Sequence, residues 1–248
     1  MVFDPGKESK HILHRRETER QDFRILRIPF DCQLLMVQAC HEIAKEARWK
    51  TRTLLHTRRF YSPASMIRLY KIHILSFIES GTPAIFHAAR THLAIIDRVQ
   101  ESFLRELGVS ETDAMLHFHL APLHTRRCIA VLGLIHRTVL GKGPPQFREW
   151  FILQPASYYS AKRSTRAASS MHDRQIFDPL DGSHSTLLAR SMAGMIRVYN
   201  DLPPDAVHAA SVKLFQRYIQ GMLKVKLASG DTSWSACLST HGDGPWLI

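Results

Sequence analysis

The sequence predicts a mainly α-helical protein, a multi-helix bundle with at most one short, unpaired strand near its N-terminus and disordered tails. Three observations favour this class. Apolar residues recur at helical spacing over much of the chain, prolines and capping residues stand where helices would begin, and only one short segment alternates as a strand does. Hydrophobic residues make up 45% of the 248 positions, which is enough to build a core.

The N-terminal part of the chain changes character twice. Residues 1–22 are polar and charged, and we expect a flexible remnant there. Apolar and basic residues partly alternate over residues 23–30, which predicts a short strand that ends near Pro29. Asp31 then resembles a helix N-cap, so a helix is expected from there to about Arg58.

Prolines, glycines and capping residues divide the middle of the chain into helices. Ser62 followed by proline predicts a helix start, and residues 81–83 interrupt the helix that follows. A second helical run is expected from Ala84 to Leu107, with a C-cap glycine after it. The segment that begins at Ser110 resembles a capping box and predicts a short helix.

Three further helices are expected from Pro122 onward. Pro122 opens a helix to about Leu140 that is apolar on most sides, which is typical of a core helix. A further helix is expected over residues 185–199, and the pair Pro203 and Pro204 predicts the start of the last one.

The charge balance favours an anionic partner. Lys and Arg number 33 against 22 acidic residues, a net charge of +11, and nucleic acid is the commonest partner of such proteins. The densest basic stretch, residues 48–71, contains no acidic residue. The alternative is a basic but inert, solvated surface. The candidate phosphate-binding residues in this stretch and just before it are Lys45, Arg48, Lys50, Arg52, Arg58, Arg59, Arg68 and Lys71.

A second basic candidate is the pair Arg126 and Arg127, on the first turn of the helix that follows Pro122. Basic side chains at this position can bind phosphate. They can equally pair with Glu111 or Asp113 of the preceding short helix, and the sequence leaves both interpretations open.

Other site types find little support. None of the four cysteines forms a CxxC pair, and His117 and His119 lack further ligands at metal-binding spacing, so no metal site is expected. The N-terminus has no apolar signal-peptide region and no apolar run reaches the roughly 18 residues of a membrane span. We therefore expect an intracellular protein, nuclear or cytoplasmic, with no membrane partner.

Five short segments occur in an order that indicates a family: residues 77–85 (FIESGTPAI), 92–100 (HLAIIDRVQ), 121–127 (APLHTRR), 198–203 (VYNDLP) and 212–216 (VKLFQ). Together they resemble the region that follows the catalytic palm in the reverse transcriptases (RNA-directed DNA polymerases) of non-LTR retrotransposons. Residues 25–36 look like the last palm strand and the start of the thumb. The resemblance spans about residues 23–225.

The resemblance implies a domain organisation and a partner. In that family the thumb is a helical module that grips the template–primer duplex by its backbone. The basic helices would accordingly bind RNA or DNA without sequence preference, and a palm domain absent from this sequence is a second possible partner. The expected parts are a flexible remnant (1–22), a helical thumb-like domain (23–151), a mobile linker (152–185), a C-terminal helical pair (186–226) and a disordered tail (227–248).

The resemblance also bears on catalysis. Polymerases of this family hold two Mg²⁺ ions with clustered aspartates, and this sequence contains no Asp-Asp dipeptide. We therefore expect a truncated, non-catalytic fragment that carries no cofactor, with Mg²⁺ needed only by the intact parent enzyme. Two other hypotheses remain: a helical protein-interaction module, and a translated transposon relic without a selected function.

Overall fold

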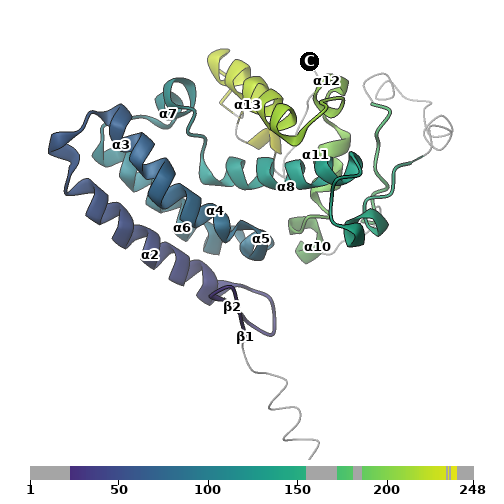
Figure 1. The fold of residues 1–248 in the computed structure, drawn as a ribbon, viewed down its shortest axis with the longest axis horizontal. Coiled ribbons are helices and arrows are strands. Elements are labelled where there is room, and N and C mark those ends of the chain that lie inside the picture. The colour runs from purple at the N-terminus through teal and green to yellow at the C-terminus, as the bar shows by residue number, and fades with distance from the viewer. Residues whose placement is uncertain (1–22, 155–171, 181–185, 233, 235, 239–248) are drawn as a thin grey trace, which may run out of the picture.

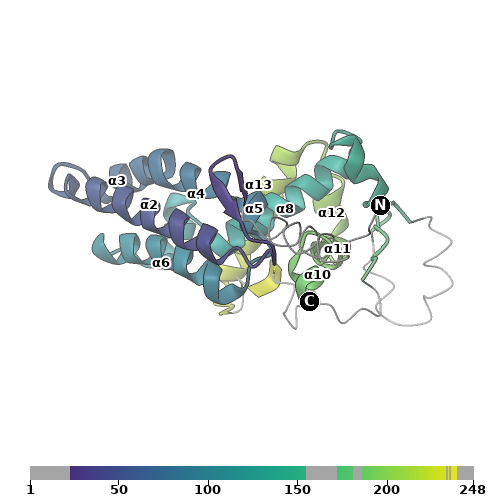
Figure 2. The ribbon, with the colours of Figure 1, turned by 90° about the horizontal axis from the view of Figure 1, so that it is seen from below.

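The computed structural model describes residues 23–154, 172–180, 186–232, 234 and 236–238, and the structural statements below concern these residues. The protein is mainly α-helical, as predicted, with one two-stranded sheet at its start. The N-terminal helices form one end of an elongated molecule and the C-terminal helices form the other (Figures 1 and 2). None of the helices in the described part combines the length and apolarity needed to cross a bilayer. The predicted N-terminal remnant lies outside the described residues.

The predicted single strand is a hairpin of two strands. β1 (Phe23–Ile25) pairs antiparallel with β2 (Ile28–Phe30). The two residues between them, Leu26 and Arg27, both have positive φ, 49° and 71°, as two-residue hairpin turns require. Neither is the Gly, Asn or Asp that usually marks such a turn, so the turn could not be predicted from these two residues. The strand that was predicted to be unpaired is therefore paired with its own neighbour.

Asp31 caps a turn, and the first helix begins later than predicted. Its carboxylate accepts hydrogen bonds from the backbone N–H groups of Gln33 (3.1 Å), Leu35 (2.8 Å) and Met36 (2.7 Å). Helix α2 (Val37–Leu55) starts only after this turn, behind a left-handed residue at Met36 (φ 58°). The predicted N-cap at Asp31 is therefore wrong by five positions, since the N-cap of α2 is Met36 and the bonds to Asp31 close a loop.

The remaining N-terminal helices pack beside α2. Ser62 and Ser110 cap α3 and α7 as predicted, by accepting the backbone N–H groups of Ser65 (3.3 Å) and Asp113 (3.0 Å). The helical elements are α3 (Pro63–Tyr70), the π-helical segment η2 (Lys71–Leu75), α4 (Ser76–Ser80), α5 (Thr82–Ile85), α6 (Arg90–Glu106) and α7 (Glu111–Phe118).

A first hydrophobic cluster lies between α2, α3 and α6. At its centre the rings of Tyr70 and Phe103 stack with their centroids 4.3 Å apart, and both side chains are fully buried. The apolar spacing that predicted these helices supplies the residues of this cluster. The cluster fixes one side of α2 in the core and leaves the opposite side of this helix exposed to solvent.

A second cluster is built around α8 (Leu123–Val139). It also contains residues from the elements η3 (Pro145–Glu149), α11 (Met195–Asn200), α12 (Pro204–Val207), α13 (Val212–Ala228) and η5 (Ala236–Leu238). A further helix, α10 (Thr186–Arg190), precedes α11. The helix predicted over 185–199 is thus two short helices. The predicted last helix is also two, because Ser211 caps a new start by accepting the backbone N–H of Leu214 (3.3 Å).

The two clusters meet at α7 and the start of α8, which does not agree with the predicted domain of residues 23–151. The apolar side chains of α8 pack against α11 and α13, so α8 belongs with the C-terminal helices. The predicted boundary after residue 151 separates helices that share one core. The sequence showed that α8 is buried but not which helices bury it.

Parts of the predicted linker and tail are packed. In the linker 152–185, Ile176 is fully buried, and Asn200 bonds both its backbone N–H (2.9 Å) and its carbonyl (2.8 Å). In the tail 227–248, Trp234 and Leu238 lie buried in the second cluster. Mobility and disorder are therefore wrong expectations for these residues, while 155–171, 181–185 and 239–248 lie outside the described part.

His136 lies at the centre of the second cluster. Its ring is fully buried, stacks on Phe215 at 4.2 Å between centroids, and contacts the hydroxyl of Tyr199 (3.1 Å) and the carbonyl of Ala209 (2.9 Å). His172, also buried, contacts the carbonyl of Tyr199 through Nε2 (3.1 Å). Burial lowers the pKa of both histidines below the ordinary value of 6.5.

These two histidines predict a protein that loses stability in mild acid. Because their folded pKa values are lowered, the unfolded chain takes up protons first as the pH falls through about 6.5. The contribution of these histidines to the free energy of unfolding is therefore fully present above about pH 6.5. It falls below that pH, by up to about 1.4 kcal/mol per pH unit for each histidine. Thermal unfolding at pH 8 and at pH 5 measures the loss. The His136→Gln variant should show a smaller pH dependence, and an unchanged dependence would contradict this prediction.

Candidate nucleic-acid interface

Three of the predicted phosphate-binding residues lie on one side of α2. Lys45, Arg48 and Arg52 are three or four positions apart, and a histidine extends the series by one turn at each end. At 100° per residue all five side chains fall within an arc of about 80° and all are exposed. We call this set the basic stripe: His41, Lys45, Arg48, Arg52 and His56.

The basic side chains of α2 differ in whether they have hydrogen-bond or ion-pair partners within the protein. Arg48 donates to the carbonyl of Ile95 on α6 (3.3 Å), and Lys50 pairs with Glu46 (3.3 Å) and lies over the ring of Phe77 at 5.3 Å from its centroid. By contrast, within the described residues no hydrogen bond or ion pair engages the side chains of Lys45 and Arg52. These two are the members of the stripe most available to a ligand.

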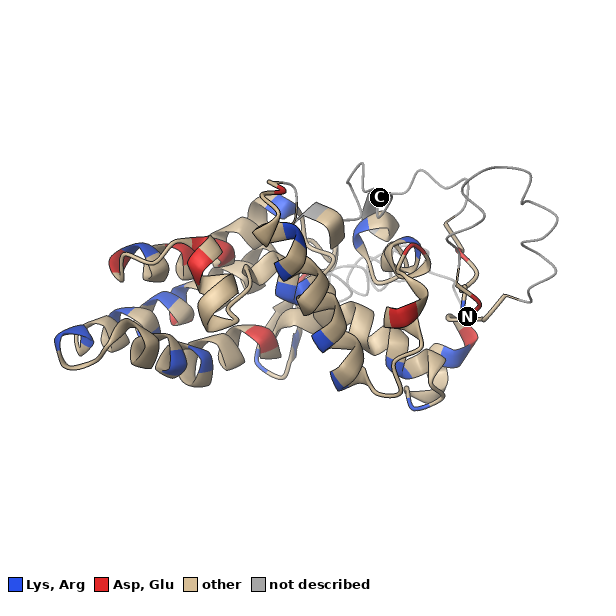
Figure 3. Ribbon diagram, turned by 90° about the horizontal axis from the view of Figure 1, so that it is seen from above, with Lys and Arg blue, Asp and Glu red and all other residues tan. Residues whose placement is uncertain are grey.

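The stripe ends at a tip where α2 turns into α3 through the 3₁₀ turn η1 (Arg58–Phe60). Figure 3 shows basic residues, in blue, at this end of the molecule. A hollow of about 470 Å³ lies there, which we call the basic hollow; it is lined by Arg52, Leu55, His56, Arg58 and Arg59. Arg58 also reaches Glu106 of α6 (2.8 Å), which neutralises part of the charge and ties the tip to α6.

Two further candidates on the same stretch behave differently from each other. Arg68 is exposed on α3, and no described residue pairs with it. Lys71 is half-buried and donates to the carbonyl of Phe118, at the end of α7. Burial, reinforced by Arg126 and Lys224, lowers the pKa of Lys71. The structure thus gives Lys71 a contact that holds α7, so Lys71 is less available to a ligand than Arg68.

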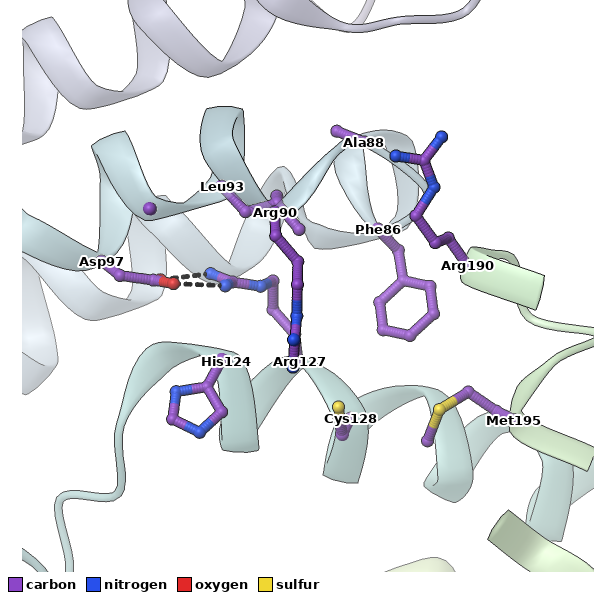
Figure 4. Close-up of a pocket in the computed structure, with 11 residues that line it drawn as sticks. Phe86, Ala88, Arg90, Leu93, Asp97, His124, Arg127, Cys128, Arg190 and Met195 are labelled. Carbon is purple, nitrogen blue, oxygen red and sulfur yellow. Dashed lines mark hydrogen bonds and ion pairs between the residues drawn. The ribbon is translucent and has the colours of Figure 1, made fainter. Parts of the chain in front are cut away.

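The structure resolves the two interpretations of Arg126 and Arg127 in favour of ion pairing, with partners other than those expected. Arg126 pairs with Glu79 (2.5 Å), and Arg127, 5% exposed, donates to both carboxylate oxygens of Asp97 at 2.7 and 2.8 Å (Figure 4). The expected partners on the short helix α7 take no part. Helix α8 starts beside α4 and α6, so the acids come from those helices.

A cavity of about 330 Å³ adjoins the Arg127–Asp97 pair (Figure 4). Phe86, Arg90 and Cys128 are among its lining residues. Burial raises the pKa of the Cys128 thiol to about 11, although Arg127 and Arg90 oppose the change. The thiol is therefore protonated at neutral pH, so Cys128 is a poor nucleophile.

The histidine pair His117 and His119 is separated in the structure. His117 lies 3.8 Å from Asp113, whereas His119 contacts Lys224 (2.8 Å), whose charge lowers the pKa of His119. No group of three or more His, Cys, Asp or Glu side chains that suits a metal ion occurs among the described residues.

Sequence reasoning missed the aromatic residues of the tip. Trp49, Phe60 and Tyr61 expose 65%, 69% and 50% of their surface, and the guanidinium of Arg59 lies 4.7 Å from the ring centroid of Phe60. The adjacent letters RRFY at 58–61 were the available signal, since arginines next to aromatics are typical of surfaces that bind nucleotide bases.

Comparison of the chain with protein-family models, with curated proteins and with solved structures gave no match.

Proposed function

We propose that this protein binds the backbone of RNA or DNA, without sequence preference, through α2 and the adjoining tip. The observation that carries the proposal is the basic stripe, in which two of the cations, Lys45 and Arg52, have no partner among the described residues. Phosphate binding needs mobile cations on a rigid element, and α2 is fixed by the first hydrophobic cluster.

The surroundings of the stripe support the same proposal. The basic hollow continues the stripe at the tip, and the sequence from residue 48 to residue 71 contains no acid that would repel phosphate. The net charge of +11 adds a long-range attraction that raises the rate of encounter with a polyanion.

We also propose that the chain corresponds to the helical region after the palm of a retrotransposon reverse transcriptase and does not polymerise nucleotides by itself. The order of the five matching segments supports the first statement, and the absence of an Asp-Asp pair from the sequence supports the second. A palm domain encoded elsewhere would then be its natural partner.

Salt-titrated binding to a duplex tests the proposed function. The logarithm of the affinity should fall linearly with the logarithm of the salt concentration. In the double variant Lys45→Gln, Arg52→Gln, affinity should drop and the magnitude of the slope should fall by up to about two.

A matched control separates this surface from net charge. The variant Lys213→Gln, Arg217→Gln removes two exposed cations from α13 and should keep the slope of the parent protein. Equal losses in the two variants would show that general charge is responsible. An absence of binding at about 50 mM salt would refute the proposal.

The alternative function, a helical protein-interaction module, is favoured by one observation. A mainly apolar cavity of about 460 Å³ opens between α5, α8, η3 and α10, with Phe86, Leu134 and Met192 among its lining residues. A protein partner seated there would be insensitive to changes on α2. Partner binding that survives the Lys45→Gln, Arg52→Gln change but is lost in Leu134→Lys would favour this alternative.

A further inference from the structure

The tip between α2 and α3 combines exposed aromatic rings with unusually dense positive charge. Trp49 lies on α2, and Phe60 and Tyr61 lie in the turn after it, all at least half exposed. Isolated exposed aromatics are common on proteins, but here Phe60 and Tyr61 directly follow Arg58 and Arg59, which line the basic hollow. The tip is also the far end of the N-terminal helices, where no other described element covers it (Figure 1).

The two features suit two different parts of one ligand. Arg52, Arg58 and Arg59 all line the hollow, and guanidinium groups bind phosphate oxygens well; of the three, Arg58 is also paired with Glu106. Exposed rings such as Phe60 offer a flat apolar face, on which a nucleotide base can stack whatever its identity. In a duplex the bases are already stacked on one another, so only unpaired nucleotides can use such a ring.

We propose that the tip binds unpaired nucleotides, with phosphates in the basic hollow and bases stacked on Phe60 and Tyr61. The inference rests on the proposed function and adds a preference for single strands, or for the unpaired end of a duplex. The basic stripe then continues the backbone track from the hollow along α2, over four turns of helix.

The shape of the tip favours this ligand over a lipid surface. Arginines and aromatics also occur where proteins touch anionic membranes. A bilayer is flat, however, whereas the arginines here line a concave hollow of about 470 Å³ that suits a single polyanionic strand. Loss of vesicle binding in the variant described below would instead indicate a membrane contact.

The test compares three ligands of equal length: a 20-nucleotide single strand, the same strand with every base removed, and a blunt duplex. The abasic strand keeps the phosphates and lacks the bases, so it isolates stacking. The full protein should bind the ordinary strand about 5-fold or more tightly than the abasic one, since stacking of one base contributes about that much or more.

Two variants with matched changes assign the effect to the tip. Phe60→Leu, Tyr61→Leu should abolish the preference for the ordinary strand and leave binding to the abasic strand unchanged. The control Trp150→Leu, Phe177→Leu alters two exposed aromatics elsewhere (67% and 44% exposed) and should keep the preference.

The outcomes separate this inference from the function on which it rests. Equal, salt-dependent binding of ordinary and abasic strands overturns the stacking inference and leaves backbone binding standing. No binding to any of the three ligands overturns both. If the Phe60→Leu, Tyr61→Leu variant loses binding to phosphatidylserine vesicles and keeps its strand preference, the tip is a membrane contact and the inference is wrong.

Discussion

Replacement of Asp97 by alanine is expected to lower the free energy of unfolding by about 3–5 kcal/mol. Arg127 is 5% exposed and donates to both oxygens of this carboxylate, at 2.7 and 2.8 Å. Removal of the carboxylate leaves a guanidinium that cannot lose its proton inside the protein. The pair also joins α6 of the first cluster to α8 of the second, so the change should loosen the contact between the two clusters.

Denaturant unfolding of purified variants measures this effect. The double variant Asp97→Leu, Arg127→Met removes both charges and keeps apolar volume, so it should regain most of the lost stability. The single substitution Glu101→Ala, at an exposed carboxylate on α6, is the control. A loss below about 1 kcal/mol for Asp97→Ala would mean that water solvates Arg127, and the buried pair would then be of little importance.

Replacement of Phe215 by alanine is expected to cost a similar amount, about 3–5 kcal/mol. This ring is fully buried, stacks on His136 at 4.2 Å and lies 6.0 Å from the ring of Tyr199. Its truncation removes dispersion contacts from both neighbours and leaves a cavity that rigid helices on either side can only partly close.

The neighbouring residue supplies the control for this second prediction. Leu214 is 48% exposed on the same helix, and its change to alanine should cost less than about 1 kcal/mol. A second readout comes from the pKa of His136, which burial lowers in the intact protein. If the cavity admits water, an NMR titration of Phe215→Ala should show that pKa moving back toward 6.5. A stability loss equal to that of Leu214→Ala would contradict the packing described for this ring.

The helix starts that sequence predicted correctly depend on local chemistry. Ser62 and Ser110 form their capping bonds within three positions along the chain, so the pattern is complete in the sequence. The incorrect predictions concern features that depend on contacts with segments distant in the sequence. The break before α13 and the packing of Ile176 depend on neighbours that no local spacing reveals.

The same distinction explains the candidate site. The basic character of α2 follows from composition, and the 3.6-residue period places Lys45, Arg48 and Arg52 on one side. The sequence does not show which basic side chains lack partners, because the partners of Lys71 and Arg127 lie 47 and 30 positions away. The sequence therefore indicated a basic surface, and the contacts of Lys71, Arg126 and Arg127 with other helices leave α2, the tip and Arg68 of α3 as its exposed part.

The position of α8 has a consequence for synthesis of the chain on the ribosome. The first cluster is complete once residues up to about Leu123 have emerged, so it can fold early. The apolar side of α8 can be buried fully only after α13 has emerged. Gln216 of α13, which donates to the carbonyl of Ile129 on α8, lies 87 positions after it. At typical elongation rates that interval lasts roughly 4–17 s, far longer than a helix needs to form. During that time we expect the nascent chain to expose a bare apolar helix, and to depend on chaperones more than its small size would suggest.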